Sequence, residues 1–312
     1  MRRTGSQGSL FSDTTTDFSV SKHDLNKYLA TREVSGLTDI WIAEIKQWLI
    51  KYLEYVNWNV NEDISLHYFN MLRKKYSTTS YRKKLYQIRK FLSYLGVAWA
   101  NNIQPPTELY YQPKRITINE IQVTLKYFDG HEVFQKIKAL IYLGISSGLR
   151  AHEIYQLTRK DIDLDKGIVR INHDPRNGQT TKTKYSRISF INNNAKQALE
   201  EYIFTVNGLN QSNILFSERV CQNIFENAPM RVKDLRKFFS QEWDRRGGPT
   251  SIKKILMGHS LKGDVDLMHY NYQSPEDLME IYNKIMGGLK ILEELKNPAQ
   301  KCSLEARTTS TE

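Results

Sequence analysis

The chain has 312 residues, a length that allows one large domain or two ordinary ones. Its 45 lysines and arginines against 34 acidic residues give a net charge of +11, which favours a polyanionic partner, nucleic acid before membrane. No apolar run approaches the roughly 20 residues that span a bilayer, and the N-terminus lacks the apolar stretch of a signal peptide. Cys221 and Cys302 stand far apart, so we expect neither a disulfide framework nor a zinc site. These features predict a cytoplasmic protein associated with DNA.

The first third of the chain is expected to form a small helical domain. Residues 1–16 are rich in serine, threonine and glycine, which predicts a disordered N-terminus. Residues 17–104 follow, and a helical run is expected over residues 81–95. Earlier in the same domain, apolar residues recur at near-helical spacing and indicate another helix: Ile40, Ile42, Ile45, Trp48, Leu49 and Leu53.

A basic stretch lies within this domain. No acidic residue occurs from Asn70 to Ala100, and tyrosines are interleaved with the basic residues. Such a face suits phosphate contacts, which fix position without reading sequence. The predicted DNA contacts are Arg73, Lys74, Lys75, Arg82, Lys83, Lys84, Arg89 and Lys90. The alternative is a solvated helix face.

A linker is expected over residues 105–116, because three prolines fall there without an apolar period. Thr117 and Glu120 have the spacing of a capping box that opens the next helix. A larger domain over residues 117–296 and a flexible tail over residues 297–312 complete the predicted organisation.

The larger domain is expected to be mainly α with a small β-sheet. Two β-like runs, residues 168–171 and 187–191, are joined by a polar stretch and predict a hairpin or small sheet. Helices are predicted over residues 132–146, 151–157, 195–206, 232–245 and 251–257, and from residue 274 to about residue 295.

Spaced polar motifs in the larger domain suit the cleavage of a phosphodiester. Cations hold a phosphate as its charge grows, a proton donor serves the leaving oxygen, and a phenol attacks. The motifs are Arg150 in Gly-Leu-Arg-Ala-His-Glu-Ile, Lys182 in Thr-Lys-Thr-Lys, Lys233 and Arg236 in Lys-Asp-Leu-Arg, His259 in Leu-Met-Gly-His-Ser, and Tyr270 in His-Tyr-Asn-Tyr.

Four of these five motifs also have a purely structural alternative. Arg150 can be a surface arginine paired to Glu153, and His259 can be a helix cap. Lys182 can be a solvated loop tip, while Lys233 and Arg236 can belong to a basic stripe on one helix face. A phenol has a pKa of about 10, so forming its phenolate at pH 7 costs roughly 4 kcal/mol, which neighbouring cations reduce.

The order and spacing of these motifs resemble the tyrosine recombinases, the family of phage-type and Xer-type integrases. The segment around Arg150 looks like the family's first box, where the arginine is catalytic and Glu153 supports it. Lys233 stands where the family usually has a histidine. This departure occurs in some archaeal virus and plasmid integrases, which the chain resembles more than the bacterial ones. A protonated lysine stabilises charge rather than accepting a proton.

The resemblance implies a recombinase catalytic domain preceded by a small helical, SAM-like core-binding domain that together clamp duplex DNA. Tyr270, with Tyr272 as its rival, would attack the phosphate and form a 3′-phosphotyrosyl bond. Arg150, Lys233, Arg236 and His259 would stabilise the pentacoordinate state. Lys182, with Lys184 as the alternative, would protonate the leaving 5′ oxygen. The family acts as a homotetramer on two duplexes without metal, small-molecule cofactor or membrane.

The function predicted from this resemblance is site-specific recombination that integrates or excises a mobile element. Four alternatives stay open at this point. They are a Xer-like chromosome-dimer resolvase, a type IB topoisomerase, a catalytically inactive DNA-binding relative, and a basic helical interaction protein with no DNA role.

Overall fold

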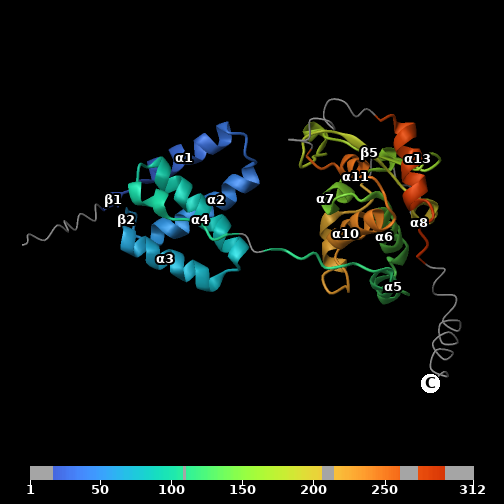
Figure 1. Ribbon diagram of the computed structural model, residues 1–312, viewed down its shortest axis with the longest axis horizontal. Coiled ribbons are helices and arrows are strands. Elements are labelled where there is room, and N and C mark those ends of the chain that lie inside the picture. Colours follow the sequence, from blue (N-terminus) through green and yellow to red (C-terminus); the bar gives the residue numbers. More distant parts are fainter. Residues whose placement is uncertain (1–16, 108–109, 206–213, 261–272, 292–312) are drawn as a thin grey trace, which may run out of the picture. The chain divides into compact units, whose positions relative to one another are not determined.

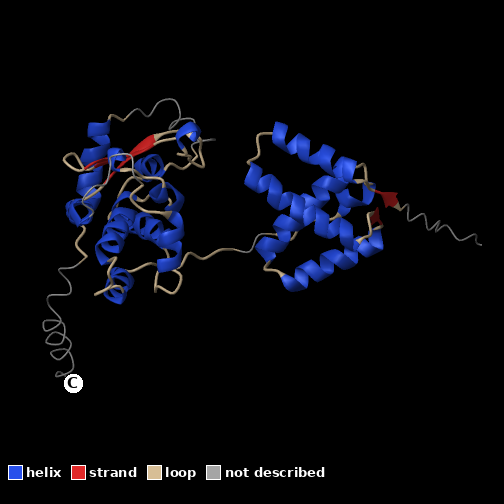
Figure 2. Ribbon diagram, turned by 180° about the vertical axis from the view of Figure 1, so that it is seen from behind, coloured by secondary structure: helices blue, strands red, loops and turns tan. Residues whose placement is uncertain are grey.

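The computed structural model describes residues 17–107, 110–205, 214–260 and 273–291. The chain divides into two compact units that part between Gln112 and Pro113. Both are built mainly from helices, and a three-stranded sheet belongs to the second, so the predicted mainly helical fold class is confirmed (Figures 1 and 2). Within the described ranges, every helix is too short or too polar to cross a membrane. The predicted disordered N-terminus (1–16) and flexible tail (297–312) lie outside these residues.

The first unit packs its helices around a core that includes Tyr28, Leu49, Tyr52 and Phe91. Ile40 belongs to the predicted apolar pattern, but it is 85% exposed because it lies in the first turn of α2, off the buried face. The elements of this unit are β1 (Phe18–Ser19), α1 (Lys22–Val34), α2 (Asp39–Tyr55), β2 (Asn59–Val60), α3 (Glu62–Lys75), α4 (Thr78–Tyr94) and a 3-10 turn (Ala98–Asn102). The strands β1 and β2 pair in antiparallel fashion.

The second unit is organised around α6, which is buried over most of its length from Ile137 to Ser147 and packs against α8 and α10. Its helices are α5 (Ile118–Tyr127), α6 (Phe134–Ser147), α7 (Ala151–Tyr155), α8 (Asn193–Thr205), α9 (Glu218–Ile224), α10 (Val232–Arg245), α11 (Thr250–Met257) and α13 (Pro275–Met286). The predicted capping box is confirmed at α5, since the Thr117 hydroxyl accepts from the Glu120 N–H at 3.2 Å.

The sheet of the second unit has the antiparallel order β3 (Ile162–Asp163), β4 (Ile168–Ile171) and β5 (Arg187–Phe190). Both predicted β-like runs are therefore strands of one sheet. The predicted last helix is shorter than expected, because α13 ends at Met286, where Gly287 and Gly288 follow.

Candidate active site

The site begins where α6 ends. Gly148 adopts a left-handed conformation with φ of 64°, and a Cβ there would run into the ring of Phe239. Glycine is therefore needed for a tight turn that places Arg150 directly before α7. The Arg150 backbone N–H donates to Oε2 of Glu153 at 2.8 Å, and its Nη1 donates to Oε1 at 2.9 Å. One carboxylate thus caps α7 and orients the guanidinium.

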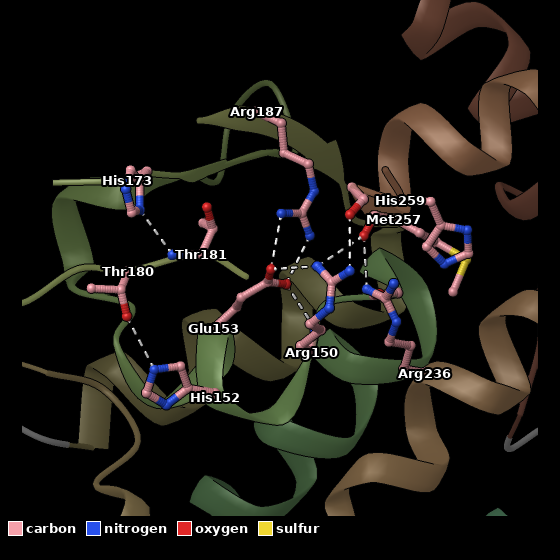
Figure 3. Close-up of polar contacts among 12 residues, drawn as sticks. Arg150, His152, Glu153, His173, Thr180, Thr181, Arg187, Arg236, Met257 and His259 are labelled. Carbon is pink, nitrogen blue, oxygen red and sulfur yellow. Dashed lines mark hydrogen bonds and ion pairs between the residues drawn. The ribbon is translucent and has the colours of Figure 1, made fainter. Parts of the chain in front are cut away.

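Glu153 is a buried carboxylate held by a second arginine from the sheet. Its side chain is 1% exposed, and that of Arg187 on β5 is 4% exposed. Arg187 donates from Nη1 to Oε1 at 3.0 Å and from Nη2 to Oε2 at 2.7 Å (Figure 3). Burial alone would raise the pKa of Glu153, but the hydrogen bonds and charges of Arg187 and Arg150 hold that pKa below its ordinary value. Glu153 is therefore an anion at neutral pH.

The C-terminal turn of α11 presents four successive carbonyls to side chains of the site. Gly258, with φ of 63°, ends the helix, and the His259 N–H closes the turn on the Lys254 carbonyl at 2.9 Å. Helix C-termini leave such carbonyls without intrahelical donors. Their donors are Arg187 Nε for Leu256 (2.9 Å), Arg236 Nη1 for Met257 (2.9 Å), Arg150 Nη2 for Gly258 (2.9 Å) and the Tyr185 hydroxyl for His259 (2.7 Å).

Arg236 reaches this turn from α10. Its Nη1 donates to the carbonyls of Met257 at 2.9 Å and of Gly148 at 2.8 Å. Burial, and then the charge of Arg150, lower the pKa of Arg236 to about 10, so the guanidinium stays charged at neutral pH. Three guanidinium groups and one carboxylate lie together here, which leaves two net positive charges among these four side chains. Such a cluster suits an anion.

His259 follows directly on this turn and is partly exposed. Burial lowers its pKa, and the charges of Arg236 and Arg150 lower it further. The imidazole is therefore neutral at pH 7, with one N–H to donate and no added charge. The structure thus brings together Arg150, Arg236 and His259, and Glu153 holds Arg150 in this group (Figure 3).

Lys182 lies on an exposed turn of the connection between β4 and β5, which the Lys184 N–H closes on the Thr181 carbonyl at 3.1 Å. Within the described ranges, neither Lys182 nor Lys184 forms a hydrogen bond or ion pair with the arginines or His259. The connection is tethered at both ends, however. The Thr181 N–H donates to Nδ1 of His173 at 3.0 Å, and Tyr185 reaches the His259 carbonyl. The turn that carries Lys182 and Lys184 is therefore joined, through the next residue Tyr185, to the backbone of His259 in the site.

Lys233 is exposed at the start of α10, one turn before Arg236. It lines a hollow of about 650 Å³ together with Ala151 and His152, which follow Arg150. Tyr270 and its rival Tyr272 lie outside the described residues, so the structure gives no position for the predicted nucleophile.

The predicted DNA contacts of the first unit fall at the end of α3 and along α4. Lys83 and Lys90 are exposed on α4, and the Lys90 ammonium lies 4.8 Å from the centre of the Tyr86 ring. Lys84 instead packs over Trp48 at 4.3 Å and over Tyr76 at 4.8 Å. The exposed members of the set are Arg73, Lys74, Lys75, Lys83 and Lys90, whereas Arg82, Lys84 and Arg89 are partly covered.

Two residues of the site escaped the sequence prediction. Arg187 was noted as the first residue of a predicted strand, five residues after Lys182, and no role in the site was predicted for it. Tyr185 had no signal that distinguished it among the 18 tyrosines.

Comparison with known proteins supports the predicted family. Residues 114–265 match the model of the phage integrase family. The tyrosine recombinase XerD of Halalkalibacterium halodurans is 27% identical over 270 residues, which cover 78% of this chain and 86% of that protein. The Tn1549 transposon integrase, solved in complex with transposon right end DNA, is 15% identical, with a TM-score of 0.59 over 82% of this chain and 96% of the solved chain. A lambda integrase tetramer bound to a Holliday junction is 10% identical, with a TM-score of 0.60 over 84% of this chain and 82% of the solved chain.

Proposed function

We propose that this chain, whose residues 114–265 match the phage integrase family, cleaves and rejoins DNA at specific sites through a 3′-phosphotyrosyl intermediate. The observation that carries the proposal is the arrangement of Arg150 and Arg236 on the carbonyls of one helix end, with neutral His259 beside them. A phosphate held there gains charge as it becomes pentacoordinate, and fixed cations stabilise that gain.

The reaction exchanges one ester for another. The Tyr270 phenolate oxygen attacks the scissile phosphorus, and the bond from phosphorus to the 5′ oxygen breaks. The 3′ end of the DNA is then joined to Tyr270, and the freed 5′ oxygen takes a proton from Lys182. Attack by a 5′ hydroxyl of the same or a partner strand reverses these steps. Because the number of phosphodiester bonds is unchanged, no nucleotide hydrolysis is needed.

Each described residue has a distinct role in this proposal. Arg150 and Arg236 hold non-bridging oxygens of the phosphate, since their guanidinium groups are already fixed by carbonyls and by Glu153. His259 donates its N–H to the same phosphate. Lys233 adds positive charge from the wall of the adjoining hollow.

The first unit is proposed to grip the duplex. Its exposed lysines and arginines on α3 and α4 suit phosphate contacts, and we expect binding that weakens steeply with salt. Assembly as a tetramer on two duplexes is proposed by likeness to the lambda integrase complex. Integration or excision of a mobile element is favoured over chromosome-dimer resolution because Lys233 replaces the usual histidine, as in archaeal mobile-element integrases.

Covalent trapping tests the proposal. The protein is mixed with nicked duplexes that carry its recombination site, with EDTA present, and the mixture is resolved in SDS. An SDS-resistant adduct that is lost in Tyr270→Phe and kept in Tyr272→Phe is the expected result. An adduct formed equally on any duplex sequence would favour the topoisomerase, and salt-sensitive binding without any adduct would favour an inactive relative.

A further inference from the structure

Arg187 uses its whole guanidinium group in contacts near the site. Its side chain is 4% exposed, and all three of its guanidinium nitrogens donate hydrogen bonds. Two of them bind the two oxygens of Glu153, and the third binds the Leu256 carbonyl at 2.9 Å. A single residue on β5 therefore ties together the sheet, α7 and the end of α11.

Glu153 also connects Arg187 to Arg150. Each oxygen of Glu153 accepts one bond from Arg187 and one from Arg150. The carboxylate cannot rotate without breaking a bond to one of the two arginines. Removing Arg187 would leave the buried carboxylate held by Arg150 alone, and the Arg150 guanidinium would lose part of what fixes its orientation.

Gly258 is fitted to the same guanidinium. A Cβ at this position would lie 2.7 Å from three atoms of the Arg187 head group. Glycine therefore lets the guanidinium pack against the turn that precedes His259. The contact fixes where that turn lies relative to Glu153.

We propose that Arg187 is a positioning residue of the cleavage reaction, which aligns Arg150 through Glu153 and holds the α11 turn that carries His259. The inference rests on the proposed function. Arg187 touches neither DNA nor the nucleophile in this account, and its effect is exerted through the residues that it holds. Nearly complete burial of its side chain agrees with this indirect role.

The shape of the guanidinium matters more than its charge here. A lysine at position 187 keeps one positive charge, but its ammonium cannot serve two carboxylate oxygens and a carbonyl in one plane. Small misplacement of catalytic groups costs on the order of a hundredfold in rate. Arg187→Lys should therefore slow cleavage while DNA binding, which depends on other residues, stays close to normal.

The test measures the single-turnover rate of adduct formation across a range of DNA concentrations, using the full chain and a nicked duplex that carries its site. Arg187→Lys is compared with the wild type and with Arg170→Lys. Arg170 lies on the neighbouring strand β4, where its side chain is 49% exposed and 4.0 Å from Asp163. Thermal unfolding of each variant first establishes that it is folded at the assay temperature.

The expected result for Arg187→Lys is a fall of about a hundredfold in the rate at saturating DNA. The DNA concentration at half-saturation should stay within about threefold, and Arg170→Lys should match the wild type. A rate for Arg187→Lys equal to that of Arg170→Lys overturns the inference. Absence of an adduct with the wild-type protein would instead overturn the proposed function.

A second variant covers the case in which Arg187→Lys is unfolded at the assay temperature. Gly258→Ala keeps every side chain of the site and pushes a methyl group against the Arg187 head group. We expect the same pattern for this variant: a slower rate at saturating DNA, with little change in the DNA concentration at half-saturation. A wild-type rate in folded Gly258→Ala would overturn the inference, because the guanidinium could then move without consequence.

Discussion

Arg150 and Arg236 share one acceptor, the carbonyl oxygen of Met257. Nη1 of Arg236 donates to it at 2.9 Å, and Nη1 of Arg150 lies 3.5 Å from it (Figure 3). Two like charges are thereby held side by side at the C-terminal end of α11, whose partial negative charge offsets part of their repulsion. A bound phosphate would offset the remainder, so the pair is arranged before DNA arrives.

Replacing Arg236 by lysine should slow cleavage strongly. Lysine lacks the planar guanidinium that binds the Gly148 and Met257 carbonyls through one nitrogen and keeps another for a phosphate oxygen, so the loss should be on the order of a hundredfold. Single-turnover adduct formation measures the rate, and fluorescence anisotropy of labelled DNA measures binding. Arg245→Lys on the same helix is the matched control, because the Arg245 side chain is 55% exposed and pairs with Glu242. Equal rates for the two variants would remove Arg236 from the site.

The Glu153 carboxylate should make stability depend on pH in the acid range. Its pKa is lower in the folded chain than its ordinary value of 4.5. Its contribution is therefore fully present above pH 4.5 and is lost as pH falls through the folded pKa. Glu153→Gln should lower the free energy of unfolding by about 3 kcal/mol at pH 7, because it leaves Arg187 buried without its counterion.

Urea unfolding of both proteins at a series of pH values measures this effect. The difference between wild type and Glu153→Gln should shrink below pH 4.5, where the wild-type carboxylate also loses its charge. A difference that stays constant down to the acid unfolding of the chain would contradict the assigned ion pair.

Lys233 should act through its charge and not as a base. Lys233→His places an imidazole there, which is charged below about pH 6.5 and neutral above it. If charge is what matters, the cleavage rate of this variant relative to wild type falls as pH rises through that range. Taking the ratio cancels the titration of His259, which both proteins share. A ratio that rises with pH would assign the position to a proton acceptor.

The basic face of the first unit should control the salt dependence of DNA binding. Lys83→Gln should reduce the slope of log affinity against log salt by about 1, because one phosphate contact is lost. Lys84→Gln is the neighbouring control, since Lys84 packs over Trp48 and Tyr76 within its own unit. Affinity titrations at several salt concentrations distinguish the two. Equal slopes in both variants and in the wild type would place the DNA elsewhere.

Helices and strands in which apolar residues recur regularly along one face were predictable from the sequence. The strand over residues 168–171 and the helix over residues 232–245 match the structure to the residue. The two-residue strands β1, β2 and β3 are too short to show alternation. Ile40 fits the helical spacing, which predicts burial, but it is exposed because it lies in the first turn of α2.

The site was predictable as a set of residue types but not as a network. Arg150, Arg236 and His259 were expected together from their motifs. The acceptors that hold the two guanidinium groups include the backbone carbonyls of Gly148, Met257 and Gly258, which leave no mark in the sequence. Arg187 and Glu153 meet across elements that are distant in the chain, so their pairing depends on the tertiary fold.

The most direct test of the central claim is to identify the residue that carries the DNA. The covalent adduct is digested with protease and nuclease, and the nucleotide-bearing peptide is sequenced by mass spectrometry. We predict a 3′-phosphoryl nucleotide on the hydroxyl of Tyr270. A nucleotide on any other residue would contradict it.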